Sequence, residues 1–264
     1  MTPVRLLIVG GGRMGEALVA GLLRAGWSAE DLAIVELDSG RREALAELFP
    51  GIGVHGAPVE ADGVVIAVKP QHVDTATREV AEAGCRRVLS IAAGVPTRKL
   101  EDRLKAGTPV VRAMPNTPAQ VGAGAAAIAP GVAALDADLE WAESILGAVG
   151  NVVRVGESDL DAVTGLSGSG PAYVFLLTEA LTMAGVAAGL DENVAAALAR
   201  QTVVGVGRLL ESSEESPAAL REAVTSPGGT TAAGLEVLRD EKFPEAVVAA
   251  VQAATARSKH LGAD

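Results

Sequence analysis

The chain has 264 residues, of which 49% are hydrophobic and 21% charged, a composition typical of one large or two ordinary globular domains. Its net charge of −11 argues against a nucleic acid or an anionic membrane as a partner, because both bind basic surfaces. Cys85 is the single cysteine and excludes an internal disulfide, and the three scattered histidines give no metal-binding spacing.

The first apolar run, Val4–Val9, is short and ends in glycines, which indicates a strand rather than a signal peptide, so a cytoplasmic protein is expected. From there, short β-type runs alternate with helical patterns, and this alternation predicts a parallel sheet with helices on both faces. The expected strands are Val4–Val9, Leu32–Glu36, Gly63–Val68, Arg87–Ile91, Pro109–Arg112 and Asn151–Val155. The expected helices between them are Gly15–Arg24, Ser39–Leu48, Gln71–Glu82, Thr97–Leu104 and Asp136–Ala148.

Strand signals end at about Glu157, and helical patterns occupy the rest of the chain. We therefore predict an α/β domain over residues 1–157 and an all-helical domain over residues 158–264. The expected helices of the second domain are Pro171–Leu190, Asn193–Glu211, Ser216–Ala223, Ala232–Glu241 and Pro244–His260.

The segment Pro171–Leu190 is nearly uncharged and about as long as a membrane span. Glu179 lies within it, however, and no basic residues flank it. A helix buried at a subunit interface is therefore favoured over a membrane helix.

A glycine loop follows the first expected strand and opens the first expected helix. Gly10, Gly12 and Gly15 match the G-x-G-x-x-G pattern in the strand–loop–helix context that it requires. The three glycines would allow the tight turn, the approach of a pyrophosphate, and the close packing of helix on strand. This pattern predicts a dinucleotide site, with the pyrophosphate at the helix N-terminus.

The end of the second strand leaves the choice between NAD and NADP open. An acidic side chain there, such as Glu36 or Asp38, would bind the ribose hydroxyls of NAD. Ser39 with Arg41 and Arg42 would instead hold the 2′-phosphate of NADP.

Further segments follow in order: A-V-K-P-Q at 67–71, S-I-A-A-G at 90–94, R-A-M-P-N-T-P at 112–118, T-G-L-S-G-S-G-P-A-Y at 164–173 and S-P-G-G-T-T at 226–231. With these segments the chain resembles the pyrroline-5-carboxylate reductase family over essentially its whole length. The resemblance implies reduction of 1-pyrroline-5-carboxylate to L-proline, the last step of proline biosynthesis, with NADPH preferred and NADH as the alternative. It also implies an N-terminal Rossmann-type doubly wound sheet followed by an all-helical dimerisation domain, in a homodimer that in this family often assembles further into a decamer.

The resemblance also implies roles for individual residues. The expected cofactor-binding residues are Gly10, Gly12, Arg13, Met14, Gly15, Ser39, Arg42, Ala67, Val68, Lys69, Pro70, Ala93 and Asn116. The expected substrate-binding residues are Ser167, Gly168, Ser169, Gly228, Gly229, Thr230 and Thr231. Gly11 and Arg13 depart from the family, in which alanine or cysteine and asparagine are common at these positions.

Hydride transfer to an imine needs little acid–base chemistry from the protein. The imine is often protonated before it binds, so a strong acid is not required, and no histidine or carboxylate cluster lies among the motifs. Thr164 or a bound water is the candidate proton donor, and Lys69 could orient the substrate carboxylate or attract the cofactor. Asn116 lies in a stiff turn and has either a role in the nicotinamide pocket or a purely structural one.

Two other functions share parts of this pattern. A β-hydroxyacid dehydrogenase has the same two-domain architecture but carries a catalytic lysine on the long helix after the domain boundary. Here the only lysines beyond residue 157 are Lys242 and Lys259. A nucleotide-sensing domain would keep the glycine loop, but it would not need the serine- and threonine-containing glycine turns.

The segment T-S-P-G-G-T-T at 225–231 is an uncharged, hydroxyl-rich turn before a helix. Gly228 and Gly229 can direct successive N–H groups inward, and the helix start adds further N–H groups. We expect this turn to hold the substrate carboxylate without a cation, with Thr230 or Thr231 adding a hydroxyl donor. The alternative is a helix stop and restart with a threonine cap.

Overall fold

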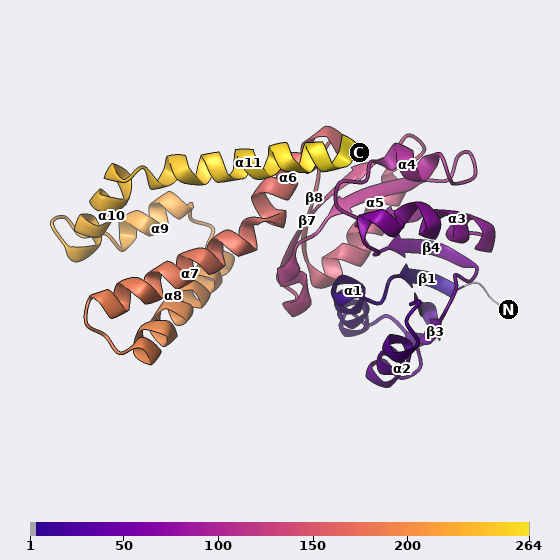
Figure 1. Ribbon diagram of the computed structural model, residues 1–264, viewed down its shortest axis with the longest axis horizontal. Helices are drawn as coiled ribbons and strands as arrows, with labels where there is room; N and C mark the ends of the chain where they lie inside the picture. Colours follow the sequence, from indigo (N-terminus) through magenta and orange to yellow (C-terminus); the bar gives the residue numbers. More distant parts are fainter. Residues whose placement is uncertain (1–3, 264) are drawn as a thin grey trace. The chain divides into compact units, whose positions relative to one another are not determined.

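The computed structural model describes residues 4–263, with side chains described for residues 4–262, and contacts divide the chain into two compact units (Figure 1). The first unit runs to Ser169 and also contains the chain from Gln252 onward, whereas Gly170–Val251 form the second unit. This division by contact differs from the boundary expected between residues 157 and 158, which stays a prediction about the domains.

The first unit is built on one sheet with the strand order β3-β2-β1-β4-β5-β6-β7-β8 (Figure 1). Neighbouring strands are parallel except β6 and β7, which pair antiparallel. This order confirms the expected doubly wound α/β fold. The strands are β1 (Val4–Val9), β2 (Leu32–Val35), β3 (Gly53–His55), β4 (Ala61–Ile66), β5 (Val88–Ser90), β6 (Val110–Met114), β7 (Gly124–Pro130) and β8 (Gly150–Arg154).

Two of these strands, β3 and β7, were not among those expected from the sequence. β3 has three residues at the edge of the sheet and is only half buried, so it carries little hydrophobic signal. β7 reads G-A-A-A-I-A-P, and alanine by itself favours helix. Ala126–Ala129 nevertheless extend as a strand because they are buried between β6 and β8, so tertiary packing overrides the local preference.

Helices cover both faces of the sheet (Figure 1). Because side chains alternate along a strand, Leu6 and Ile8 of β1 pack on one face and Leu7 and Val9 on the other. The first face is covered by α1 (Arg13–Arg24), α2 (Ser39–Leu48) and α5 (Asp136–Leu146), and the second by α3 (Val73–Ala83) and α4 (Thr97–Glu101).

Short helical segments connect these elements. α6 (Leu160–Val163) is followed by a π-helix over Thr164–Gly168, which leads directly into the second unit. The 3₁₀ segments are Ala29–Asp31, Pro70–His72, Thr117–Val121, Gly147–Val149 and Glu157–Asp159.

The aromatic content is only 2%, and a small residue lets one of the few large rings pack closely against the sheet. A Cβ on Gly63 would press on the ring of Trp141, and the same ring stacks with the guanidinium of Arg87 at 4.5 Å. The other tryptophan, Trp27, stacks with Arg5 at 4.1 Å. Both tryptophans therefore lie in the first unit.

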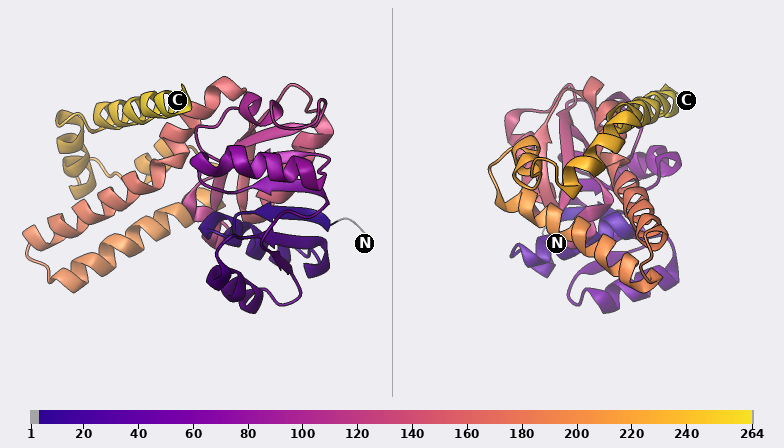
Figure 2. Two further views of the ribbon diagram at one scale, coloured as in Figure 1. Left: turned by 45° about the vertical axis from the view of Figure 1, so that its right-hand side comes forward. Right: turned by 90° about the vertical axis from the view of Figure 1, so that its left-hand side faces the viewer.

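The described residues of the second unit form helices joined by turns and contain no strand, as expected. Its helices are α7 (Gly170–Ala187), α8 (Glu192–Ser212), α9 (Pro217–Ala223), α10 (Thr230–Asp240) and the first part of α11 (Phe243–Ala263). α7 and α8 lie side by side as a hairpin (Figure 2), and Gly185 allows this contact because a Cβ there would lie 2.8 Å from the Cβ of Ala195. The Asp191 carboxylate begins α8 by accepting from the N–H groups of Asn193 and Val194.

The continuous helical stretch Glu157–Ala187 is long and apolar enough to cross a bilayer by length and composition alone, with a mean hydropathy of 1.3 in its most apolar part. None of that part is buried inside the chain. Large apolar side chains of α7 are exposed, including Phe175 at 64%, Leu176 at 65% and Met183 at 72%. Such a surface is typical of a helix that packs against another protein surface.

Candidate functional site

The strand order reverses between β1 and β4, which makes their carboxyl ends the point where α/β sheets bind ligands. The two loops that leave these ends lie next to each other. Gly10 N donates to the carbonyl of Val35 at 2.8 Å, and Ala67 N donates to the carbonyl of Val9 at 2.8 Å. The fold thus brings together the glycine loop and the Ala67–Pro70 loop, two motifs that are far apart in the sequence.

The surroundings of Gly10, Gly12 and Gly15 explain why each of these positions is a glycine. Gly10 has φ +112°, and a Cβ there would lie 2.7 Å from the carbonyl oxygen of Ala67. A Cβ on Gly15 would press on the carbonyl oxygen of Gly10. A Cβ on Gly12, in contrast, would meet no atom within 4 Å, so the space above this residue is open.

The N-terminus of α1 faces this open space. Gly12 is the N-cap residue, and no side chain caps the helix. The first N–H groups of α1 are therefore available to an anion, and their dipoles favour one. A site that is open only at Gly12 and lined by free N–H groups fits the pyrophosphate of a dinucleotide.

The side chains of Glu36 and Arg41 hold the backbone of the loop at Gly11. The Glu36 carboxylate accepts from Gly11 N and from Asp38 N, both at 3.1 Å. Arg41 Nε donates to the carbonyl of Gly11 at 2.9 Å, and the same guanidinium forms an ion pair with Glu16. A Cβ on Gly11 would press on the side chain of Leu45, which accounts for glycine at this position.

The two residues expected at the NADP 2′-phosphate lie at the start of α2. Ser39 is its first residue, and the Asp38 carboxylate caps the helix by accepting from Arg41 N at 2.7 Å. Arg42 Nη1 donates to the carbonyls of Glu36 at 2.9 Å and Leu37 at 2.7 Å. The guanidinium of Arg42 is thus fixed over the end of β2, where the adenosine ribose of a dinucleotide is bound in this fold.

A cavity of about 390 Å³ lies beside these loops. The expected cofactor residues in its wall are Gly10, Gly12, Ala67, Val68 and Lys69. Glu36 and Leu37 also line it, so the cavity joins the glycine loop, the end of β2 and the loop after β4. A second cavity, of about 630 Å³, contains Gly12 and Arg13 together with Glu16 and Arg41.

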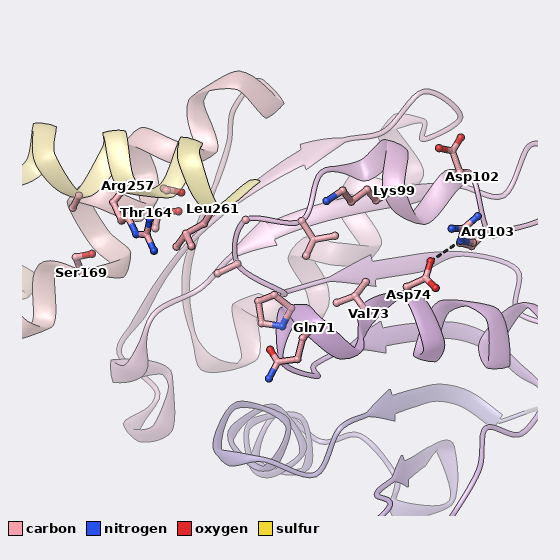
Figure 3. A pocket seen from close by; sticks show the side chains of 16 residues that line it. Gln71, Val73, Asp74, Lys99, Asp102, Arg103, Thr164, Ser169, Arg257 and Leu261 are labelled. Carbon is pink, nitrogen blue, oxygen red and sulfur yellow. Dashed lines mark hydrogen bonds and ion pairs between the residues drawn. The ribbon is translucent and has the colours of Figure 1, made fainter. Parts of the chain in front are cut away.

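The largest of these cavities, about 930 Å³, lies wholly in the first unit (Figure 3). It brings together four of the expected site residues, Pro70, Ala93, Thr164 and Ser169. Figure 3 shows Thr164, Ser169 and the end of α11 on one side and Gln71, Val73 and Asp74 on the other. Asp74 is paired with Arg103 and Arg78, and the Arg103 hydrogen bond above all lowers its pKa below the usual value, so this carboxylate stays ionised.

The π-helix that carries Thr164, Ser167 and Gly168 is held by the turn after β6. Asn116 Nδ2 donates to the carbonyl of Ser167 at 3.0 Å, and Asn116 Oδ1 accepts from Ala125 N at 2.9 Å. Both ends of this nearly buried amide are therefore engaged with the protein. Asn116 positions the π-helix relative to β7, while its expected contact with the cofactor stays a prediction.

Glu157 is a further residue of the site that was not expected from the sequence. Its carboxylate accepts from Thr97 N at 2.7 Å and from Thr97 Oγ1 at 2.8 Å, and it pairs with the buried Arg112 at 3.3 Å. Glu157 thereby joins the start of α4 to β6 and to the segment that leads into α6. No local sequence pattern predicts this role, because the partners of Glu157 lie 60 and 45 residues away in the sequence.

The turn at residues 226–231 lies in the second unit. Gly228 has φ +68°, the left-handed region that glycine favours, and Gly229 N donates to the carbonyl of Ser226 at 3.0 Å. Gly229 is the N-cap of α10 and no side chain caps the helix, so the alternative of a threonine cap does not form. Thr230 and Thr231 occupy the first turn of the helix, and the Thr231 side chain is exposed.

No group of three or more His, Cys, Asp or Glu side chains in the described part of the chain could hold a metal ion. The site is instead built from backbone N–H groups, hydroxyls and a few charged side chains. A doubly wound sheet with a glycine loop at its switch point and a cavity beside it is the architecture of a dinucleotide-dependent oxidoreductase.

Comparison with known proteins gives the family. Residues 157–261 match the family model for pyrroline-5-carboxylate reductase dimerisation, and residues 5–94 match the model described as NADP oxidoreductase coenzyme F420-dependent. The pyrroline-5-carboxylate reductase of Mycobacterium tuberculosis is 44% identical over 97% of this chain and 96% of its own length. That of Synechocystis is also 44% identical, over 98% of both chains. The chain therefore belongs to the pyrroline-5-carboxylate reductase family.

Solved structures agree over the whole chain. The pyrroline-5-carboxylate reductase of Coxiella burnetii has a TM-score of 0.93 at 35% identity and covers 98% of this chain and 99% of its own. The Plasmodium falciparum enzyme, solved with NADP bound, has a TM-score of 0.82 at 29% identity and covers 99% of both chains. These matches confirm the resemblance, the fold class and the NAD(P)H-dependent oxidoreductase activity expected from the sequence.

Proposed function

We propose that this chain reduces 1-pyrroline-5-carboxylate to L-proline, preferentially with NADPH, in the cytoplasm. The main support for this reaction is the family match over the whole chain. The glycine loop also supports it, because among its glycines only Gly12 has open space above its Cα atom. The preference for NADPH is supported by Ser39 and Arg42 at the start of α2.

The chain's own residues have to orient the imine carbon toward the nicotinamide. The reduced nicotinamide, when bound, supplies the hydride. Pro70, Ala93, Thr164 and Ser169 share one cavity, and this juxtaposition supports placing the reacting ring there. None of these four residues is a strong acid, which is consistent with a substrate that arrives already protonated as an iminium.

Thr164 is suited to hold the ring nitrogen. Its hydroxyl donates to the carbonyl of Leu160 at 2.8 Å, which leaves the oxygen lone pairs free to accept. The N–H of a protonated imine is the matching donor. Hydride addition at the adjacent carbon then turns the iminium into the neutral amine, and no protein group has to supply a proton in that step.

The reaction is tested with the purified enzyme, the imine and NADPH. We expect imine-dependent loss of the reduced-nicotinamide absorbance and formation of L-proline in equal amount, checked by amino-acid analysis. Oxidation of NADPH without formation of proline, or reduction of NADP+ by a β-hydroxyacid with no activity on the imine, would contradict the proposed function.

The cofactor preference makes a prediction about Arg42. We expect Arg42→Ala to raise the KM for NADPH about tenfold and to leave the KM for NADH nearly unchanged, because a hydrogen bond to a charged phosphate is worth about 1.5–3 kcal/mol. Steady-state kinetics with each cofactor would measure this. The ratio of the two KM values is decisive, since loosening the bonds of Arg42 to the Glu36 and Leu37 carbonyls would affect both cofactors alike.

Arg24→Ala, at the exposed end of α1, is the matched control and should change neither KM. A wild-type enzyme that prefers NADH would overturn the assignment. Glu36 would then be the residue that binds the ribose hydroxyls.

Oligomerisation follows from the family, and we propose that the minimum unit is a homodimer. Phe175, Leu176 and Met183 on α7 are exposed within the chain, which favours an extensive hydrophobic interface of the obligate type. Sedimentation at micromolar concentration should give at least the mass of two chains. A stable, active monomer would contradict the prediction, and a decamer would extend it.

A further inference from the structure

The last turns of α11 belong to the first unit although the helix begins in the second. Ser258, on these turns, is buried with 5% of its surface exposed. Its hydroxyl donates to Asp161 Oδ1 at 2.6 Å, across 97 residues of sequence. A short hydrogen bond to a carboxylate is among the stronger side-chain interactions, so this bond fixes α11 against α6.

The bond also sets the rotation of α11. Ala254, Arg257, Ser258 and Leu261 follow the i, i+3, i+4, i+7 spacing that places side chains on one helix face. All four line the cavity of about 930 Å³. Figure 3 shows Arg257 and Leu261 beside Thr164. Rotating α11 would therefore replace one wall of the cavity.

Asp161, the acceptor, lies three residues before Thr164. α6 has only four residues and continues directly into the π-helix at Thr164–Gly168. A helix this short has little stability of its own, and π-helical turns are rare and often occur at functional sites. Thr164 depends on α6 for its orientation, because its hydroxyl donates to the carbonyl of Leu160, the first residue of α6.

The C-terminal end of α11 also contacts the Ala93–Gly94 loop. A Cβ on Gly262 would lie 2.9 Å from the carbonyl oxygen of Gly94, a backbone atom that has to move to make room. Gly94 has φ +73° and follows Ala93, one of the expected cofactor residues. Only a residue without a side chain allows α11 to approach this loop so closely.

From these contacts we propose that the C-terminal turns of α11 are a positioning element for the site: Ser258, through Asp161, orients the segment that carries Thr164, and Gly262 holds the Ala93–Gly94 loop. In this proposal Ser258 and Gly262 act through other residues and not on the reacting atoms. The inference rests on the proposed roles of Thr164 and Ala93 in imine reduction.

The first test removes the Ser258 bond. Ser258→Ala is expected to lower kcat for imine reduction about three- to tenfold, with the affinity for NADPH nearly unchanged. This loss is smaller than the full value of a hydrogen bond to a charged group because the bond acts on Thr164 only through α6. Asp161→Ala should give the same loss, whereas Asp161→Asn keeps an acceptor oxygen and should stay within about twofold of wild type. Lys259→Ala changes the neighbouring exposed residue and serves as the control.

The second test moves the loop at Gly94. Gly262→Ala is expected to weaken NADPH binding about three- to tenfold in a fluorescence titration without substrate, on the scale of a contact worth roughly one hydrogen bond. Gly147→Ala is the matched control, because a Cβ at Gly147 would meet no atom within 4 Å.

The outcomes separate positioning from stability. A Ser258→Ala enzyme that melts earlier but keeps its kcat would overturn the positioning role, as would an equal loss in Lys259→Ala or unaltered cofactor binding in Gly262→Ala. Should Ser258→Ala not fold, the comparison of Asp161→Asn with Asp161→Ala decides the question. If the proposed function itself is wrong, the wild-type enzyme will not reduce the imine. The NADPH titration of Gly262→Ala still tests the positioning role in that case.

Discussion

Gly12→Ala is expected to weaken NADPH binding roughly 10- to 100-fold while leaving the melting temperature within about a degree of wild type. The loss follows because a Cβ would displace the pyrophosphate from the α1 N–H groups, and hydrogen bonds to a charged group are worth about 1.5–3 kcal/mol. The stability is retained because Gly12 has φ −73°, which alanine adopts readily, and no atom lies within 4 Å of the added Cβ. A cofactor titration and a thermal melt measure the two effects.

Gly15→Ala is the informative comparison. Its Cβ would press on the carbonyl oxygen of Gly10, so both stability and cofactor binding should fall. If Gly12→Ala also melted early, the effect on cofactor would be indirect. Unchanged NADPH affinity in Gly12→Ala would show that the pyrophosphate does not bind at this loop.

Thr231→Val should lower kcat/KM for the imine by about 10- to 100-fold, because a hydroxyl bonded to a carboxylate is worth roughly 1–3 kcal/mol. The KM for the cofactor and the melting temperature should barely change. The Thr231 side chain is exposed in the first turn of α10, and that helix has no side-chain cap to lose. Valine keeps the shape of threonine and removes only the hydroxyl.

Thr108→Val provides the matched control, since Thr108 lies in the loop before β6, away from the candidate site residues. Normal imine kinetics in Thr231→Val would show that the Thr231 hydroxyl does not bind the substrate carboxylate. Loss of stability with unchanged kinetics would assign the residue to the fold of α10 alone.

The parts of the site that could be predicted are those whose chemistry lies in local spacing. Gly10, Gly12 and Gly15 are close in sequence, so their steric roles follow from the pattern and its strand–helix context. The turn at Gly228 and Gly229 was predicted for the same reason, and its left-handed glycine is observed. Roles in binding still rest on the resemblance to the family.

The parts that could not be predicted depend on partners far away in the sequence. Glu157 meets Thr97 across 60 residues, and Ser258 meets Asp161 across 97 residues. Nothing in the residues around either carboxylate indicates these bonds. β7 was missed for a related reason, since its alanines form a strand only because β6 and β8 flank them.

The placement of the two tryptophans has a spectroscopic consequence. Trp27 and Trp141 are the only tryptophans of the chain, and both lie in the first unit, each against an arginine. Intrinsic tryptophan emission is therefore a reporter of the nucleotide-binding unit alone, whereas far-ultraviolet circular dichroism is weighted toward the helices of both units. Following one denaturation with both signals resolves whether the two units unfold together or in sequence, without any label on the protein.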